Sequence, residues 1–79
     1  MKKKYVIYDY CFPVIFTEGM AHDSVKTGRE PTSAGFFNVR PDTDPNANGF
    51  IHVTCYGESV SLNLKPSDFD SRILESFLN

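Results

Sequence analysis

The residues whose spacing best suits metal chemistry lie between Asp42 and Gly49. The segment 44–49 reads D-x-N-x-N-G, the opening of a calcium loop, in which oxygen ligands alternate and a glycine makes the sharp turn. A calcium site here would use four oxygen-bearing side chains, those of Asp42, Asp44, Asn46 and Asn48. The twelfth position of such a loop is Cys55 instead of a bidentate glutamate, and Asp and Asn are ordinary turn residues. A turn is the favoured interpretation, and a small calcium-binding module is the alternative.

Residue types used in hydrolases occur at two places. His22, Asp23 and Ser24 are contiguous, whereas a catalytic triad needs three side chains that converge from separate elements. The segment 57–61 begins like a nucleophile elbow but has Ser61 where the second glycine belongs, and it joins two expected strands instead of a strand and a helix. A small hydrolase is therefore the least favoured function, and we predict no catalytic residues.

Cysteine and histidine do not have the spacing of a zinc site. His52 and Cys55 are three residues apart on an expected strand and so point to opposite faces, and Cys11 and His22 add no paired motif. We expect both cysteines to be reduced and predict no cofactor. The net charge of −2, with basic residues clustered only at 2–4, predicts no nucleic-acid or membrane partner.

The segment Gly49–Leu64 has the pattern of a β-hairpin with Gly57 and Glu58 as its two-residue turn. Strand alternation then gathers the apolar side chains on one face, namely Ile51, Val53, Cys55, Val60, Leu62 and Leu64. A one-residue shift would place leucines opposite polar groups, so pattern and turn chemistry predict one register.

The remaining chain predicts three further strands and one helix. The strands are expected at residues 4–10, 14–17 and 34–39, with a long loop over 18–33 and a flexible basic tip at 1–3. Ser67 is placed to cap a helix over 67–78, with Asp70 as its capping partner and Phe77 on its apolar stripe facing Leu62. We therefore predict one α+β domain, a five-stranded antiparallel meander sheet with one C-terminal helix packed on one face. No secretory signal or bilayer span is recognisable, which favours a cytoplasmic protein.

The outer face of this expected sheet is uncharged and contains tyrosine, a composition common at protein contacts. The predicted partner-binding residues are Tyr8, Tyr10, Phe37, Thr54, Tyr56 and Ser61.

Three short segments carry a resemblance. SAGF at 33–36, CYGESVSL at 55–62 and the helix with Asp70, Ile73 and Leu74 resemble small uncharacterised proteins encoded by bacteriophages and prophages. The resemblance implies no activity and no site residues. Together with the absence of a catalytic motif, it leads us to expect an accessory protein that acts by binding a host factor or a second copy of itself.

Overall fold

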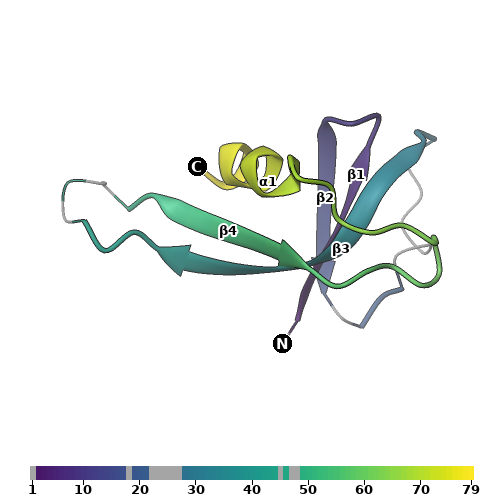
Figure 1. Cartoon of the computed structure of the whole chain (residues 1–79), viewed down its shortest axis with the longest axis horizontal. Helices are drawn as coiled ribbons and strands as arrows, with labels where there is room; N and C mark the ends of the chain where they lie inside the picture. Colours follow the sequence, from purple (N-terminus) through teal and green to yellow (C-terminus); the bar gives the residue numbers. More distant parts are fainter. Residues whose placement is uncertain (1, 18, 22–27, 45, 47–48) are drawn as a thin grey trace.

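The computed structural model describes residues 2–17, 19–21, 28–44, 46 and 49–79. It is an α+β fold in which one antiparallel sheet, in the order β2-β1-β3-β4, carries a helix packed against β4 (Figure 1). Its elements are β1 Lys3–Tyr8, β2 Phe12–Thr17, β3 Pro31–Pro41, β4 Ile51–Tyr56 and α1 Asp70–Leu78. The fold class and the C-terminal helix are confirmed. Two expected bounds change. Lys3 already lies in β1, so the expected tip 1–3 ends one residue early. β3 begins at Pro31, so the expected loop 18–33 ends three residues early.

The β1–β2 hairpin forms with a tighter turn than expected, because β1 ends at Tyr8 instead of residue 10 and β2 begins at Phe12 instead of residue 14. Asp9 and Tyr10 both have positive φ, 52° and 64°, and the Cys11 N–H donates to the Tyr8 carbonyl at 3.1 Å, as in the mirror-image turns that match strand twist. Residues 5–8 of β1 are buried on both faces because β1 lies between β2 and β3. The aromatic and β-branched residues of this strand suit that central position.

The predicted hairpin over Gly49–Leu64 is wrong. β4 pairs with β3 in a register that runs from Phe36 opposite Tyr56 to Pro41 opposite Ile51. Gly57 has a positive φ of 75°, but the chain there leaves the sheet, and residues 59–64 close a tight turn through paired bonds between Ser59 and Leu64. The eleven-residue β3 pairs with β1 through its first part and extends past it to pair with β4 through residues 36–41.

The five-stranded meander is therefore corrected to four strands, and the order is not that of a meander. β3 returns to lie beside β1 instead of β2. The alternation expected within β4 is nevertheless present, since Val53 is buried and Thr54 is exposed.

The two faces of the sheet carry separate cores. On the helix face, which α1 covers, Leu74 packs with Tyr5, Ile7, Phe37 and Val53. On the turn face, Leu62 and Leu64 pack against a second cluster of Val6, Tyr8 and Ala34. Leu62 and α1 thus lie on opposite faces of the sheet, so the expected contact between Phe77 and Leu62 is wrong.

Gly35 marks the place where the chain returns from the turn face to α1. A Cβ at Gly35 would lie 2.9 Å from both the Pro66 ring and the Tyr56 carbonyl oxygen. Residue 35 must therefore lack a side chain for the segment that leads to α1 to cross β3 so closely.

We expect Gly35→Ala to lower the free energy of unfolding by about 1–3 kcal/mol, because the added methyl overpacks a contact that includes backbone. Urea denaturation would measure the change. Gly19→Ala is the matched control, since its added Cβ meets nothing nearer than 4.0 Å. Equal stability of the two variants would contradict this account of the crossing.

Candidate functional site

Among the described residues, the buried charged side chain is that of Asp70, which is 1% exposed at the start of α1. Its Oδ1 accepts hydrogen bonds from the hydroxyls of Ser33 at 2.8 Å and Ser67 at 2.9 Å. Its Oδ2 accepts from the Tyr5 hydroxyl at 2.6 Å and from the Ser67 N–H at 3.0 Å. The ion pairs of the described residues do not include Asp70, so dipoles and not a cation compensate its charge. These four bonds join β1, β3 and the segment before α1.

The predicted pairing of Ser67 with Asp70 is present, although α1 begins three residues later than expected, at Asp70. Phe69 occupies the N-cap position without a side-chain hydrogen bond. The Asp70 side chain reaches back to the Ser67 N–H, as the acidic partner of a capping box does. The Ser67 hydroxyl also donates to Asp70, so Ser67 stabilises the buried carboxylate as well as the start of the helix.

Two titratable neighbours of Asp70 are held in their neutral forms. Burial raises the pKa of the Tyr5 phenol well above its ordinary value, and its hydrogen bond to Asp70 adds to the effect. Burial also raises the pKa of the Cys55 thiol to about 11, although a hydrogen bond with Tyr5 partly opposes this. A thiol with that pKa is protonated at neutral pH and is a poor nucleophile. The cluster is therefore suited to holding the fold together.

We expect Asp70→Asn to lower the free energy of unfolding by about 3 kcal/mol, because the amide nitrogen would face hydroxyl and N–H donors and leave buried groups unpaired. Tyr5→Phe, which removes one donor of four, should cost less, about 1–2 kcal/mol. Chemical denaturation of both variants would test this, with the exposed neighbour Asp68→Asn as the control. If Asp68→Asn and Asp70→Asn were equally stable, the cluster would not hold the fold.

The free edge of β4 is covered by side chains from α1. The Val53 N–H donates to the Glu75 carboxylate at 3.1 Å. The Asn79 side-chain amide pairs with Ile51 as a neighbouring strand would, accepting from its N–H at 2.9 Å and donating to its carbonyl at 3.0 Å. An uncovered strand edge invites pairing with another chain, and α1 removes that opportunity at β4.

The predicted calcium ligands form turns. Asp42 accepts from the Asp44 N–H at 2.8 Å, and Asp44 accepts from the Asn46 N–H at 2.9 Å. The other Asp42 oxygen lies 2.7 Å from His52 Nε2. Asn48 lies outside the described residues. No group of three or more His, Cys, Asp or Glu side chains suited to a metal gathers within the described ranges.

The pKa of Asp42 is lowered, chiefly by the hydrogen bond from the Asp44 backbone and then by the one with His52. A lowered folded-state pKa stabilises the fold above the ordinary carboxyl pKa, and this stabilisation is lost as the pH falls through the folded value.

We therefore expect Asp42→Asn to lower the melting temperature above the ordinary carboxyl pKa, with the gap to the unmodified protein closing as the pH falls through the lowered pKa of Asp42. Thermal melts monitored by circular dichroism from neutral pH into the acid range would measure this gap. The exposed Asp68→Asn is the control, and a gap that widened with acid would contradict the assignment.

The six predicted partner-binding residues do not form one surface. Tyr8 is 3% exposed and Phe37 is 2% exposed, and they lie in the cores on opposite faces of the sheet. Tyr10 is exposed in the β1–β2 turn, and Ser61 lies in the turn that follows β4. Thr54 and Tyr56 remain on one exposed strip of β4.

His22, Asp23 and Ser24, whose contiguity argues against a catalytic triad, lie outside the described residues. Cys11 and Cys55 both carry free thiols, Cys11 exposed in the β1–β2 turn and Cys55 half-buried on β4.

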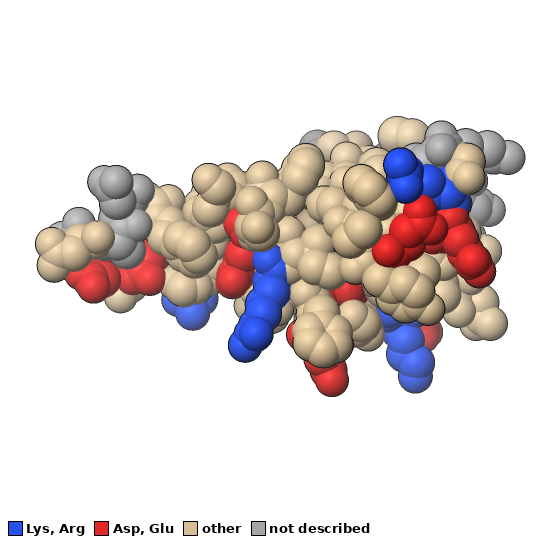
Figure 2. Space-filling view, turned by 90° about the horizontal axis from the view of Figure 1, so that it is seen from above, with Lys and Arg blue, Asp and Glu red and all other residues tan. Residues whose placement is uncertain are grey.

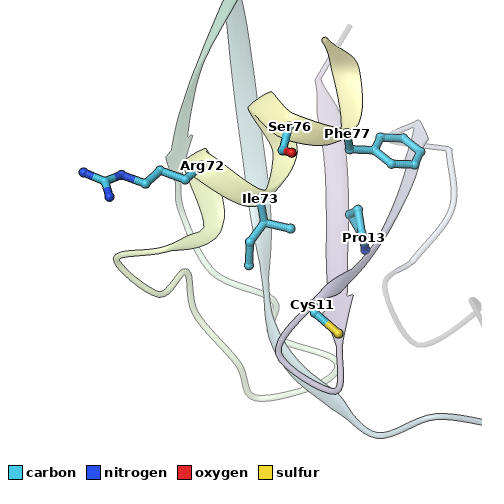
Figure 3. Close-up of a pocket in the computed structure, with 6 residues that line it drawn as sticks. All are labelled: Cys11, Pro13, Arg72, Ile73, Ser76 and Phe77. Atoms are coloured by element: carbon cyan, nitrogen blue, oxygen red, sulfur yellow. The ribbon is translucent and has the colours of Figure 1, made fainter.

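A surface feature that sequence reasoning missed is a hollow between α1 and β2. This α1–β2 groove has a volume of about 410 Å³ and is lined by Cys11, Pro13, Arg72, Ile73, Ser76 and Phe77 (Figure 3). A smaller hollow of about 140 Å³ adjoins it on the other side of Ile73 and includes Tyr10 and Phe69. Three large aromatic side chains around the two hollows are exposed: Tyr10 by 81%, Phe69 by 69% and Phe77 by 59%.

The helix sequence contains a signal for this groove. Asp70 and Leu74 form one row at i, i+4 spacing, and both are buried. Phe69, Ile73 and Phe77 form a second row beside it at the same spacing. The first row is buried, and Ile73 of the second row packs half-buried against the helix-face core, whereas Phe69 and Phe77 stay exposed beside the hollows.

Comparisons with known protein families, with curated proteins and with solved structures found no match for this chain. The resemblance to phage-encoded proteins stays a prediction. Within the described ranges, no helix is long and apolar enough to cross a membrane.

Proposed function

We propose that this protein is a non-enzymatic binding module that contacts another polypeptide through the α1–β2 groove. The observation that carries the proposal is the exposure of Tyr10, Phe69 and Phe77 around an apolar hollow. Aromatic side chains that insert into or surround such hollows provide much of the binding energy at protein interfaces. In a domain of 79 residues, three large side chains left outside the core are a substantial apolar surface.

The electrostatics of the groove favour an uncharged or weakly charged partner. Arg72 is the charged residue among those that line it. On the face seen in Figure 2, lysine and arginine lie interspersed with aspartate and glutamate, and uncharged surface occupies the space between them. Such a surface gives no long-range attraction of one sign, so shape and apolar contact would decide what binds.

The interior polar cluster supports a non-catalytic role. Each oxygen of Asp70 already accepts two hydrogen bonds, and the Cys55 thiol is protonated at neutral pH. Neither group therefore offers the free base or the thiolate that acid–base or nucleophilic catalysis needs. The expected partners, a host factor or a second copy, both fit a binding module of this kind.

Selection of linear peptides from a random display library tests the proposal. Peptides with alternating apolar residues should be enriched on the unmodified protein and should bind Phe77→Lys at least about tenfold more weakly, a loss typical of a central aromatic contact. Val60→Lys is the matched control, because Val60 is 86% exposed in the turn after β4, away from the groove. Selected peptides that bound Phe77→Lys as tightly as the unmodified protein would reject the groove as the binding surface.

A further inference from the structure

We infer that the occupant of the α1–β2 groove is a second copy of this chain, which pairs its β2 antiparallel to the β2 of the first copy. This inference rests on the proposed function and names the partner of the same surface. It joins two described features: the outer edge of β2, and the apolar groove beside that edge.

The two edge strands of the sheet, β4 and β2, differ in how their outward backbone groups are covered. At β4, Glu75 and Asn79 of α1 hydrogen-bond to the outward backbone groups of Val53 and Ile51. β2 is the other edge strand, and in the described part of the chain it pairs with β1 only. An entering strand would extend the sheet at β2 and would lie against Ile73 and Phe77 of α1 (Figure 3).

β2 itself has the chemistry that such an entering strand needs. Its sequence, FPVIFT, contains no charged residue, so two copies can pair without placing like charges opposite each other. It lacks the edge lysine or inward charge with which proteins commonly prevent such pairing, and its edge proline, Pro13, removes a single outward N–H. A second copy therefore supplies an uncharged strand for an uncharged edge.

The position of Pro13 determines the register in which two copies of β2 can pair. Pro13 lies opposite Ile7 of β1 and has no N–H to donate there, which is the arrangement expected when its nitrogen faces outward. Alternate residues share that direction, so the backbone groups of Ile15 and the N–H of Thr17 also point to the open edge, while the Thr17 carbonyl accepts from the Met20 N–H at 3.2 Å. With Ile15 on the two-fold axis, the two copies exchange N–H···O bonds at Ile15, and each Thr17 N–H meets a Pro13 carbonyl.

The exposed aromatic side chains supply about half of the area that each partner of a standard dimer contributes. With side chains of about 200 Å² each, Tyr10, Phe69 and Phe77 together expose about 400 Å². That area is about half of the ~800 Å² that each partner contributes to a standard interface. The edge of β2 and the walls of the groove would contribute the remainder.

Sedimentation equilibrium and amide hydrogen exchange, measured on the full chain, test the inference together. The mass should rise from monomer to dimer between about 1 and 500 µM, a range ordinary for an interface of this size. Over the same range, exchange of the Ile15 and Thr17 amides should slow while exchange of the exposed Ser61 amide stays constant. Phe77→Lys should weaken the dimer at least about tenfold, and Val60→Lys should leave it unchanged.

Three results would overturn the inference. They are a mass that stays monomeric across the range, a dimer whose Ile15 exchange does not depend on concentration, and a dimer that Phe77→Lys leaves intact. Circular dichroism would confirm that each variant is folded. Phe69→Lys, at a more exposed position on the adjoining hollow, replaces Phe77→Lys if that variant does not fold. A monomer that still bound the selected peptides at the groove would reject the second copy and keep the proposed function.

Discussion

The fold depends on one buried negative charge. An ionised carboxylate removed from water is very costly unless its environment compensates it. Asp70 receives that compensation from four hydrogen-bond donors on Tyr5, Ser33 and Ser67, which are far apart in the sequence. They converge only if β1 and β3 are neighbours and α1 begins above them. The requirement that all four bonds form together therefore selects the strand order and the position of the helix.

The path of the chain after β4 follows from this requirement. Residues 59–64 form a turn whose leucines cover the turn face of the sheet, and Pro66 then crosses Gly35 to bring Ser67 to Asp70. A small sheet is thereby covered on both sides, by a helix on one face and by a turn on the other. The C-terminal part of α1 then lies along β4, where Glu75 and Asn79 satisfy its backbone.

The same geometry leaves the surface on which binding is proposed. Asp70 fixes the start of α1 above β1 and β3, and Glu75 fixes its later part along β4. In this position Ile73 packs against the core, while Phe69 and Phe77 stay exposed beside the two hollows. An open strand edge next to an apolar groove is an arrangement that an incoming extended chain can complete. The polar groups that might suggest chemistry are instead used to hold helix, sheet and loop together.

Local patterns were sufficient to predict several parts of this protein. The aromatic, β-branched stretch at β1, the alternation within β4, the turn chemistry after Asp42 and the pairing of Ser67 with Asp70 all depend on residues close in the sequence. The partner of β4 was not predictable in this way, since residues 51–56 alternate equally well against β3 and against residues 59–64. Nor did the helix sequence show that Asp70 is buried beside Leu74 while Phe69 and Phe77 of the apolar stripe stay exposed. Only the tertiary structure decided these points, because the contacts that separate the alternatives, above all those of Asp70 with Tyr5 and Ser33, join residues 65 and 37 positions apart.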